Sequence, residues 1–173
     1  MFTALIPAGC LAEEQAPQKT ILTWDGPISD MFVSSGLAGR FMAYESLGLL
    51  MMIPSQFTQM ELTEEDAANH LLDVYADENG TPCISIVQDF PSDEITFESL
   101  EQLESVMRSN NPDALYQQCV INGLDVMIYG REDLDMMCAL LLLTDGELLQ
   151  IICRNTSTYN QLYSFVFASL QAM

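Results

Sequence analysis

Three short turn signals divide the chain after residue 70 into alternating apolar stretches and tight turns. Asn79-Gly80, Asn122-Gly123 and Asp145-Gly146 each lie between segments rich in β-branched and other apolar residues. Such pairs adopt the positive φ angles of a two-residue type I′ turn at little cost, so they predict three β-hairpins. The six strands are expected at residues 71–78, 81–90, 115–121, 124–130, 135–144 and 147–154.

The turns also predict the register of the strands, because side chains along a strand alternate between its two faces. In the first hairpin, a two-residue loop gives the facing pairs Ala76–Cys83, Val74–Ser85 and Leu72–Val87. We expect these small and branched side chains to share the better-buried face of the hairpin. Tyr75, Ile84 and Ile86 would then lie on the opposite face.

The register of the third hairpin concerns two cysteines. A two-residue loop at Asp145-Gly146 places Cys138 directly opposite Cys153, and facing residues in antiparallel strands lie at separations that a disulfide can bridge. The two side chains therefore form either a cross-strand disulfide in an oxidising compartment or a pair of packed thiols. We prefer packed thiols, because cross-strand bridges are strained and a reducing compartment keeps thiols free.

Two further strands are expected ahead of the hairpins. Residues 41–45 and 49–53 are apolar, with Gly48 between them and Pro54 after the second. Within the third hairpin, residues 136–143 are apolar without a break, which is typical of a central strand covered on both faces. The sheet is therefore expected to have about six to eight antiparallel strands.

Apolar positions at helical spacing predict two main helices. The first is expected at residues 96–110 with Thr96 as its N-cap. The second, at residues 156–172, is capped by Thr156 or Ser157 and carries no charge, so we expect it to be buried against the sheet. The expected fold class is α+β, an antiparallel β-sheet built from hairpins and flanked by these two helices.

The residues before this domain differ from it in composition. Residues 13–39 contain many Gln, Pro, Ser and Gly, which indicates a tether or arm ahead of an α+β domain at 40–173. Residues 1–12 are apolar and contain Ala8-Gly9-Cys10, which is similar to the end of a bacterial lipoprotein signal. We interpret them as the remnant of such a signal, with Cys10 as the site of lipid attachment. The alternative is the apolar N-terminus of a cytosolic protein.

Composition and charge exclude partners more readily than they identify one. The 173 residues include 5 basic and 25 acidic side chains, giving a net charge of −20. Affinity for nucleic acid depends on neutralising phosphates with Lys and Arg, so nucleic acid is excluded as a partner. The same charge repels anionic lipid surfaces, which leaves Cys10 as the expected membrane contact. Since 49% of the residues are hydrophobic, the chain can build a folded core.

Candidate catalytic and metal-binding residues are sparse. The sequence contains neither a phosphate-binding glycine motif nor a hydrolase or metalloprotease motif, and its five cysteines show no CxxC spacing. His70 is the single histidine, so a structural zinc site or a thiol–imidazole pair is not expected. Acidic clusters at 64–66 and 89–94, and the loop at 77–80, offer at most weak calcium ligands. We therefore assign no catalytic, cofactor or metal residues.

The order of elements and five stretches of sequence resemble the PsbP-like fold family. The stretches are residues 44–49 (YESLGL), 53–57 (IPSQF), 121–123 (ING), 143–151 (LTDGELLQI) and 167–170 (FASL). This family includes the photosystem II extrinsic protein, a Ran-binding nuclear-import factor and many bacterial lipoproteins of unknown function. The resemblance covers about residues 40–173 and rests on packing and turn residues. It implies a fold and a binding role, and no shared catalytic set.

Three functions follow as hypotheses. The first is a non-enzymatic, extracytoplasmic domain of the bacterial cell envelope that binds a protein or a small ligand and needs no cofactor. The second is an acidic cytosolic chaperone of the type III secretion kind, which binds partner polypeptides through a sheet face. The third is a hydrolase that uses surface carboxylates, which cannot be chosen among 25 acids without their geometry. The oligomeric state is not predicted.

Overall fold

The computed structural model describes residues 19–90, 97–144 and 146–173. Its helices are α1 (Pro27–Ser34), α2 (Glu64–Ala68), α3 (Leu100–Asn110) and α4 (Thr156–Ala168). Its strands are β1 (Thr20–Leu22), β2 (Gly39–Tyr44), β3 (Leu49–Pro54), β4 (Thr58–Gln59), β5 (Leu71–Ala76), β6 (Pro82–Asp89), β7 (Leu115–Ile121), β8 (Leu124–Arg131), β9 (Met136–Leu142), β10 (Leu148–Arg154) and β11 (Gln171–Ala172). Two 3₁₀ turns, η1 (Glu45–Leu47) and η2 (Glu132–Leu134), join strand pairs.

The strands form one large sheet and one small sheet. The large sheet has eight strands in the order β1-β7-β8-β9-β10-β6-β5-β4, and all of its neighbours are antiparallel except β1 and β7. The small sheet has the order β11-β3-β2. This confirms the predicted α+β class and the three predicted hairpins, in a large sheet whose eight strands lie within the predicted six to eight. The strands expected at 41–45 and 49–53 are present as β2 and β3, but they form the separate small sheet. The strands β1, β4 and β11 and the helices α1 and α2 were not predicted.

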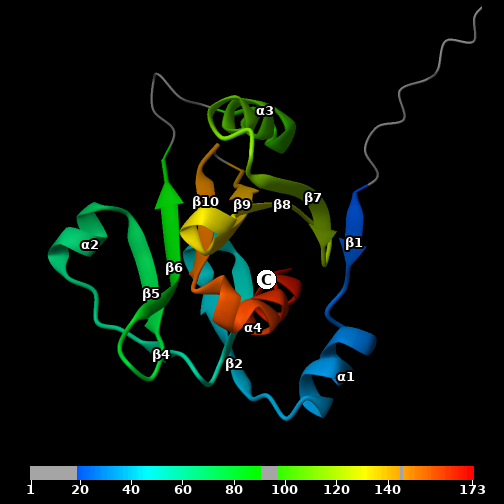
Figure 1. Ribbon diagram of the computed structural model, residues 1–173, viewed down its shortest axis with the longest axis vertical. Coiled ribbons are helices and arrows are strands. Elements are labelled where there is room, and N and C mark those ends of the chain that lie inside the picture. Colours follow the sequence, from blue (N-terminus) through cyan, green and yellow to red (C-terminus); the bar gives the residue numbers. More distant parts are fainter. Residues whose placement is uncertain (1–18, 91–96, 145) are drawn as a thin grey trace, which may run out of the picture.

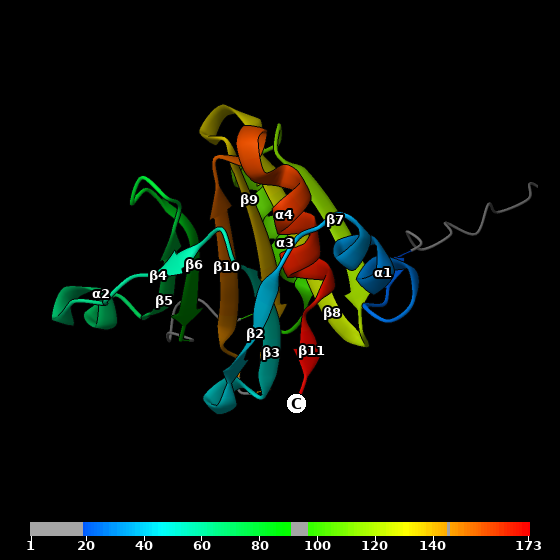
Figure 2. The same ribbon diagram turned by 90° about the horizontal axis from the view of Figure 1, so that it is seen from below.

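The large sheet is covered by different elements on its two faces. In Figure 1, α3 lies above the sheet, whereas α4 and the strand β2 lie below it. Figure 2, seen from below, shows α4 beside the small sheet, with β11 continuing from its end. The domain therefore has three layers, with a hydrophobic cluster on each side of the large sheet.

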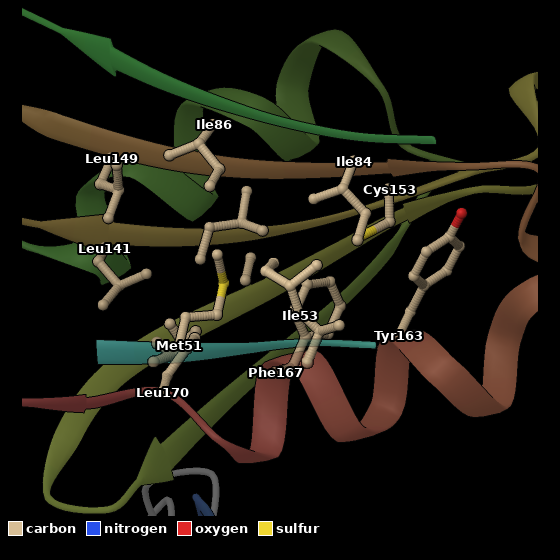
Figure 3. Close-up of a cluster of buried hydrophobic side chains, with 14 of the residues drawn as sticks. Met51, Ile53, Ile84, Ile86, Leu141, Leu149, Cys153, Tyr163, Phe167 and Leu170 are labelled. Carbon is tan, nitrogen blue, oxygen red and sulfur yellow. The ribbon is translucent and has the colours of Figure 1, made fainter. Parts of the chain in front are cut away.

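The central strand β9 contributes to both hydrophobic clusters, as its unbroken apolar sequence predicted. Ala139 and Leu141 face the larger cluster with α4 and the small sheet, whereas Cys138 and Leu140 face the smaller cluster under α3. Figure 3 shows the larger cluster, in which side chains from the sheet meet Met51 and Ile53 of β3 and residues of α4. Burying apolar surface on both faces stabilises the three layers.

The three predicted turns have two different geometries. Asn122 and Gly123 have φ of 48° and 85°, and Ile121 pairs with Leu124, so the second hairpin has the predicted two-residue turn. In the first hairpin, the Asp77 carboxylate accepts hydrogen bonds from the backbone N–H of Asn79 (2.9 Å) and Thr81 (3.0 Å). These bonds favour a loop one residue longer, in which the single left-handed residue is a glycine.

The register of the first hairpin differs from the prediction at its two ends, where the pairing shifts between Tyr75 and Ala76 beside the longer loop and again between Leu71 and Asp73. Val74 does pair with Ser85, but Ala76 pairs with Pro82 and Leu71, rather than Leu72, pairs with Val87. The prediction of the better-buried face was wrong. The side chains that α4 and the small sheet cover most completely are Tyr75, Ile84 and Ile86.

The third hairpin differs from its prediction in the same way. The backbone N–H of Leu143 donates to the carbonyl of Glu147, so the loop is one residue longer than a type I′ turn. Cys138 therefore pairs with Ile152, and Cys153 pairs with Met137. A shift of one residue moves a side chain to the other face of a strand. The two cysteines consequently belong to clusters on opposite faces of the sheet, and both are free thiols.

Both main helices are present with different ends from those predicted. The N-cap of α3 is Ser99, whose hydroxyl accepts the N–H of Gln102; Thr96 lies outside the described residues. The helix α4 ends at Ala168 rather than at residue 172, because the chain then forms β11 beside β3. The N-cap of α4 is Asn155, one residue before the predicted caps Thr156 and Ser157.

Asn122 joins three parts of the chain at the end of the β7–β8 hairpin. Its side-chain oxygen accepts the backbone N–H of Trp24 (2.7 Å), and its side-chain amide donates to the carbonyls of Ala168 (2.9 Å) and Leu170 (2.6 Å). Its own N–H donates to the carbonyl of Leu22. The turn thus connects the segment after β1 with the C-terminal end of α4.

The segment expected as a tether at 13–39 contributes structure over its described part. The strand β1 pairs with β7 in parallel, and α1 inserts Phe32 against Phe165 of α4, with ring centroids 5.2 Å apart. Residues 1–18, including Cys10, lie outside the described residues. Among the described helices, none has both the length and the apolar character needed to cross a membrane.

Candidate binding site

A notch of about 740 Å³ lies at one end of the large sheet, beside the C-terminal end of α3. One wall is the connection from α3 to β7, residues 110–115, and the other is the end of β8 with the first part of η2, residues 130–133. Ligand pockets in proteins commonly have volumes of about 300–1,000 Å³, so the notch is large enough to hold part of a partner molecule.

The Arg131 guanidinium occupies the notch in a fixed orientation. Its Nε and Nη2 donate to the two carboxylate oxygens of Asp133 at 2.7 and 2.5 Å, and its Nη1 donates to Asn111 Oδ1 at 2.7 Å. Asp133 raises the pKa of Arg131, and the Arg131 guanidinium lowers the pKa of Asp133. Paired hydrogen bonds between a planar guanidinium and a carboxylate hold the side chain in one orientation, with its remaining N–H groups available to a ligand.

The backbone around Asn111 is also held in place. Its N–H donates to the carbonyl of Met107 and ends α3, while its own carbonyl accepts the Tyr116 hydroxyl at 3.0 Å. Tyr116 in turn packs under the Arg108 guanidinium, which lies 4.4 Å from the ring centroid. The two walls of the notch are therefore connected by side-chain and backbone contacts before any partner binds.

The lining of the notch combines charge with an apolar rim. Asp113 and Glu132 are exposed carboxylates, in addition to Asp133. Leu115, in the lining, has 58% of its surface exposed, and the neighbouring Leu134 of η2 has 52% exposed. Hydrogen-bond donors, acceptors and apolar side chains are thus all available, which suits a segment of polypeptide more than a single ion.

A second polar cluster is buried where the small sheet meets the edge of the large sheet. Asp73, on β5, is 5% exposed. Its carboxylate accepts hydrogen bonds from the hydroxyls of Tyr75 (2.6 Å) and Tyr44 (3.1 Å) and from the side-chain amide of Gln59 (2.9 Å). Burial, with these hydrogen bonds, raises the pKa of Tyr44 and Tyr75. Both phenols therefore stay protonated and donate to the carboxylate.

The Asp73 cluster has little space beside it. The adjoining cavity, which Tyr44 lines together with apolar side chains such as Leu47 and Ile151, measures about 10 Å³. This volume is close to the minimum for one water molecule. The cluster therefore joins β2, β4 and β5, and the cavity beside it among the described residues is too small for a substrate.

The residues singled out from the sequence lie in different parts of the structure. Cys10 is outside the described residues. Cys138 and Cys153 are buried on opposite faces, where burial raises the pKa of Cys138 to about 12 and that of Cys153 well above its usual value. His70 is exposed and contacts the Phe90 ring. Among the described residues, no three His, Cys, Asp or Glu side chains lie close enough together to hold a metal ion.

The acidic clusters proposed as weak calcium ligands have structural roles in their described part. Asp66 accepts the N–H and hydroxyl of Thr63 and completes the capping box that begins α2. Asp77 holds the loop of the first hairpin, and the N–H of Thr81 is the main cause of its lowered pKa. Asp89 accepts a hydrogen bond from Gln150. Residues 91–96 lie outside the described residues.

Sequence reasoning missed the residues that form the notch. Arg131 and Asn111 are far apart in the chain and belong to no motif. The signals that could have marked them are the turn-forming run at 110–113 (NNPD) and the charged run at 131–133 (RED), which end a helix and a strand. Neither run predicts that its partner lies across the same notch.

Comparisons with known proteins show a likeness at the level of the fold. No protein-family model matches the sequence, and no curated protein matches it. Among solved structures, the solution structure of cyanobacterial PsbP (CyanoP) from Synechocystis sp. PCC 6803 is similar, with a TM-score of 0.50 and 10% sequence identity. The similarity covers 79% of this chain and 93% of CyanoP. This confirms the fold that the sequence resemblance implied: the chain has a PsbP-like fold.

Proposed function

We propose that this chain is a non-enzymatic interaction domain of the bacterial cell envelope, which binds a partner polypeptide in the notch beside Arg131. The observation that carries the proposal is the oriented Arg131 guanidinium in a notch of about 740 Å³. Arg131 and the amide groups of Asn110 and Asn111 offer donors to backbone carbonyls of a partner. Asp113 and Glu132 offer acceptors to its N–H groups.

The polar groups of the notch support binding more than catalysis. The Arg131 guanidinium is paired with Asp133, and the described lining includes no histidine or cysteine that could transfer a proton or attack a substrate near neutral pH. The Asp73 cluster, a second concentration of polar groups, adjoins a cavity of only about 10 Å³. A partner that covers Leu115 and Leu134 would also bury apolar surface, which favours association.

The location outside the cytoplasm is part of the same proposal. The PsbP-like fold and the Ala8-Gly9-Cys10 sequence both support an envelope protein tethered by lipid on Cys10. Growth with a labelled fatty acid should label the protein in its native cells and leave Cys10→Ser unlabelled. An unlabelled wild-type protein found with the cytosol would contradict the tether and the location, without bearing on the notch.

Site-specific photo-cross-linking in the native cells tests the notch. A benzophenone amino acid at Leu115, in the lining, should give a cross-link to a partner, whereas the same group at Val33 should not. Val33 is a matched control because it lies on α1 and is 71% exposed. Arg131→Ala should remove the cross-link from position 115, because the donors to the partner are lost.

A charge control separates the role of the guanidinium from a change in net charge. Lys19→Ala also removes one positive charge, but Lys19 lies beside Asp125 and Glu101 near β1. This variant should keep the cross-link from position 115. The proposal is wrong if position 115 and position 33 label the same proteins, or if Arg131→Ala folds normally and leaves labelling unchanged.

A further inference from the structure

A second surface that the notch does not include lies on the face of the large sheet that carries α3. The β5–β6 hairpin has a groove of about 270 Å³ there. Its apolar lining consists of Met60, Leu62, Leu71, Val74 and Pro82. These residues come from the hairpin itself and from the segment that runs from β4 into α2.

The register explains why this groove lies on the same face as α3. Val74 pairs with Ser85, and Ser85 pairs with Ile152 of β10. Ile152 packs against the hydrophobic cluster that includes Leu100 and Leu103 of α3. Side chains in such a row across a sheet point to the same face. The groove therefore continues the face that α3 covers farther along the sheet.

The covering by α3 does not extend to β5. Figure 1 shows α3 above the strands β8 to β10, while β5 lies at the side of the sheet next to α2. The helix α2 borders the groove, because Asp66 in its first turn is part of the lining. Met60 is held at its rim by a hydrogen bond from its N–H to the carbonyl of Val74, and its side chain is 39% exposed. The accessible apolar side chains are thus grouped in one groove.

The charges around the groove have one sign. Glu61 lies in its lining, and Glu64 and Glu65 follow in the first turn of α2. All three are exposed, and within the described part of the chain none forms an ion pair. Asp66 also lines the groove, but its carboxylate is already bonded to Thr63. A cationic group at the rim would therefore meet the free carboxylate of Glu61, and those of Glu64 and Glu65 lie close by in the sequence.

We infer that this groove binds a partner segment in which a large apolar side chain lies between lysines or arginines. The apolar side chain would fill the hollow between Met60 and Val74, as anchor residues do at protein interfaces. The flanking cations would lie near Glu61, Glu64 and Glu65, where complementary charge selects the partner. Such docking presupposes the proposed role as an interaction domain but does not depend on the notch.

A synthetic peptide provides the probe for this surface. The peptide KKLFKK, blocked at both ends, should bind the full-length Cys10→Ser protein and shift backbone amide resonances of Met60, Leu71, Val74 and Ser85. The peptide KKSSKK has the same charge without the apolar pair and should bind at least about tenfold more weakly. Met60→Gln keeps the size of the side chain and should also weaken binding of KKLFKK.

Matched variants separate the groove from the general acidity of the protein. Glu61→Gln, Glu64→Gln and Glu65→Gln together should weaken binding of KKLFKK by about tenfold, as expected for the loss of several exposed ion pairs. Asp25→Asn, Asp30→Asn and Glu45→Gln remove the same charge from exposed positions elsewhere. This second set should change the affinity by less than about twofold.

Three results would overturn the inference. Equal weakening by the two charge sets would show that the peptide binds only through net charge. Self-association that perturbs the same four amides in the absence of peptide would show that a second copy occupies the groove. Perturbation of those amides on removal of residues 1–18 would show that the chain covers the groove itself. These results do not affect the proposal for the notch, which cross-linking from Leu115 tests separately.

Discussion

The side-chain amide of Asn122 donates a 2.6 Å hydrogen bond to the backbone carbonyl of Leu170, near the end of the chain as described. A residue that forms a tight turn between β7 and β8 thereby also holds the segment that follows α4. The same amide reaches Ala168, while the side-chain oxygen accepts the N–H of Trp24. Two separate demands, a left-handed backbone and three side-chain hydrogen bonds, therefore apply to one asparagine.

Asn122→Asp should reduce the free energy of unfolding by about 2–4 kcal/mol, because it replaces the donor to two carbonyls with an acceptor. Aspartate tolerates the φ of 48°, so backbone strain stays nearly unchanged. Urea unfolding at neutral pH measures the effect. Asn79→Asp, in an exposed turn, is the matched control and should change stability by less than about 0.5 kcal/mol. Equal effects of the two substitutions would contradict the role of Asn122.

Asp73→Ala should lower the free energy of unfolding by about 2–4 kcal/mol, because the hydroxyls of Tyr44 and Tyr75 and the Gln59 amide lose their shared acceptor. Asp73→Asn retains one acceptor oxygen and should cost less. Tyr44→Phe should lose about 1 kcal/mol in the wild type and much less in the Asp73→Ala background. Additive effects in this double-mutant cycle would show that the two side chains do not interact.

Asp135 should make stability depend on pH at the start of α4. Its carboxylate accepts the N–H of Ser157 and the hydroxyls of Thr156 and Ser157, and these bonds lower its pKa from the usual 3.8. A lowered folded-state pKa gives stability that is present above the unfolded pKa and lost as pH falls through the folded value. Asp135→Asn should therefore destabilise the protein at pH 6 and make progressively less difference below pH 3.8.

Thermal unfolding of the two proteins from pH 2 to 7 measures this difference. Asparagine accepts the left-handed φ of 48° at this position, so the comparison isolates the charge from backbone strain. A difference in melting temperature that stays constant across the range would count against titration of Asp135.

The four described thiols should be free and nearly unreactive in the folded protein. Burial raises the pKa of the thiols at Cys119, Cys138 and Cys153, which leaves little thiolate to react. In the Cys10→Ser protein, Ellman's reagent at pH 8 should react slowly with the native state. In urea without a reductant, it should react with four thiols. Detecting only two thiols in urea would indicate that two cysteines form a disulfide, contrary to this prediction.

The sequence patterns predicted elements and their order better than they predicted register. Asn122 and Gly123 both adopt left-handed φ angles readily, and the two-residue turn predicted for them is present. At Asp77, a carboxylate bound to two backbone N–H groups lengthened the turn by one residue. This competition between side chain and backbone depends on local geometry, and it changed which side chains are opposite each other.

The better-buried face and the helix ends required tertiary information. Tyr75 is buried because α4 and the small sheet cover that face of β5, and neither contact can be read from alternation within the hairpin. Similarly, α4 ends where the chain pairs with β3, although residues 169–172 continue an apolar helical pattern. The notch joins Arg131 to Asn111 across two chain segments, so a linear motif could not predict it.

The small sheet constrains the order in which the protein can complete its fold. β3 is followed by its neighbour β11 only about 120 residues later in the chain, where Gln171 pairs with Leu50. At about 5–20 residues per second, a ribosome needs roughly 6–24 s to synthesise that interval. During this time the edge of β3 at Leu49 and Leu50 lacks its partner strand. The nascent chain therefore has a defined interval in which a holding chaperone would protect it from strand-mediated aggregation.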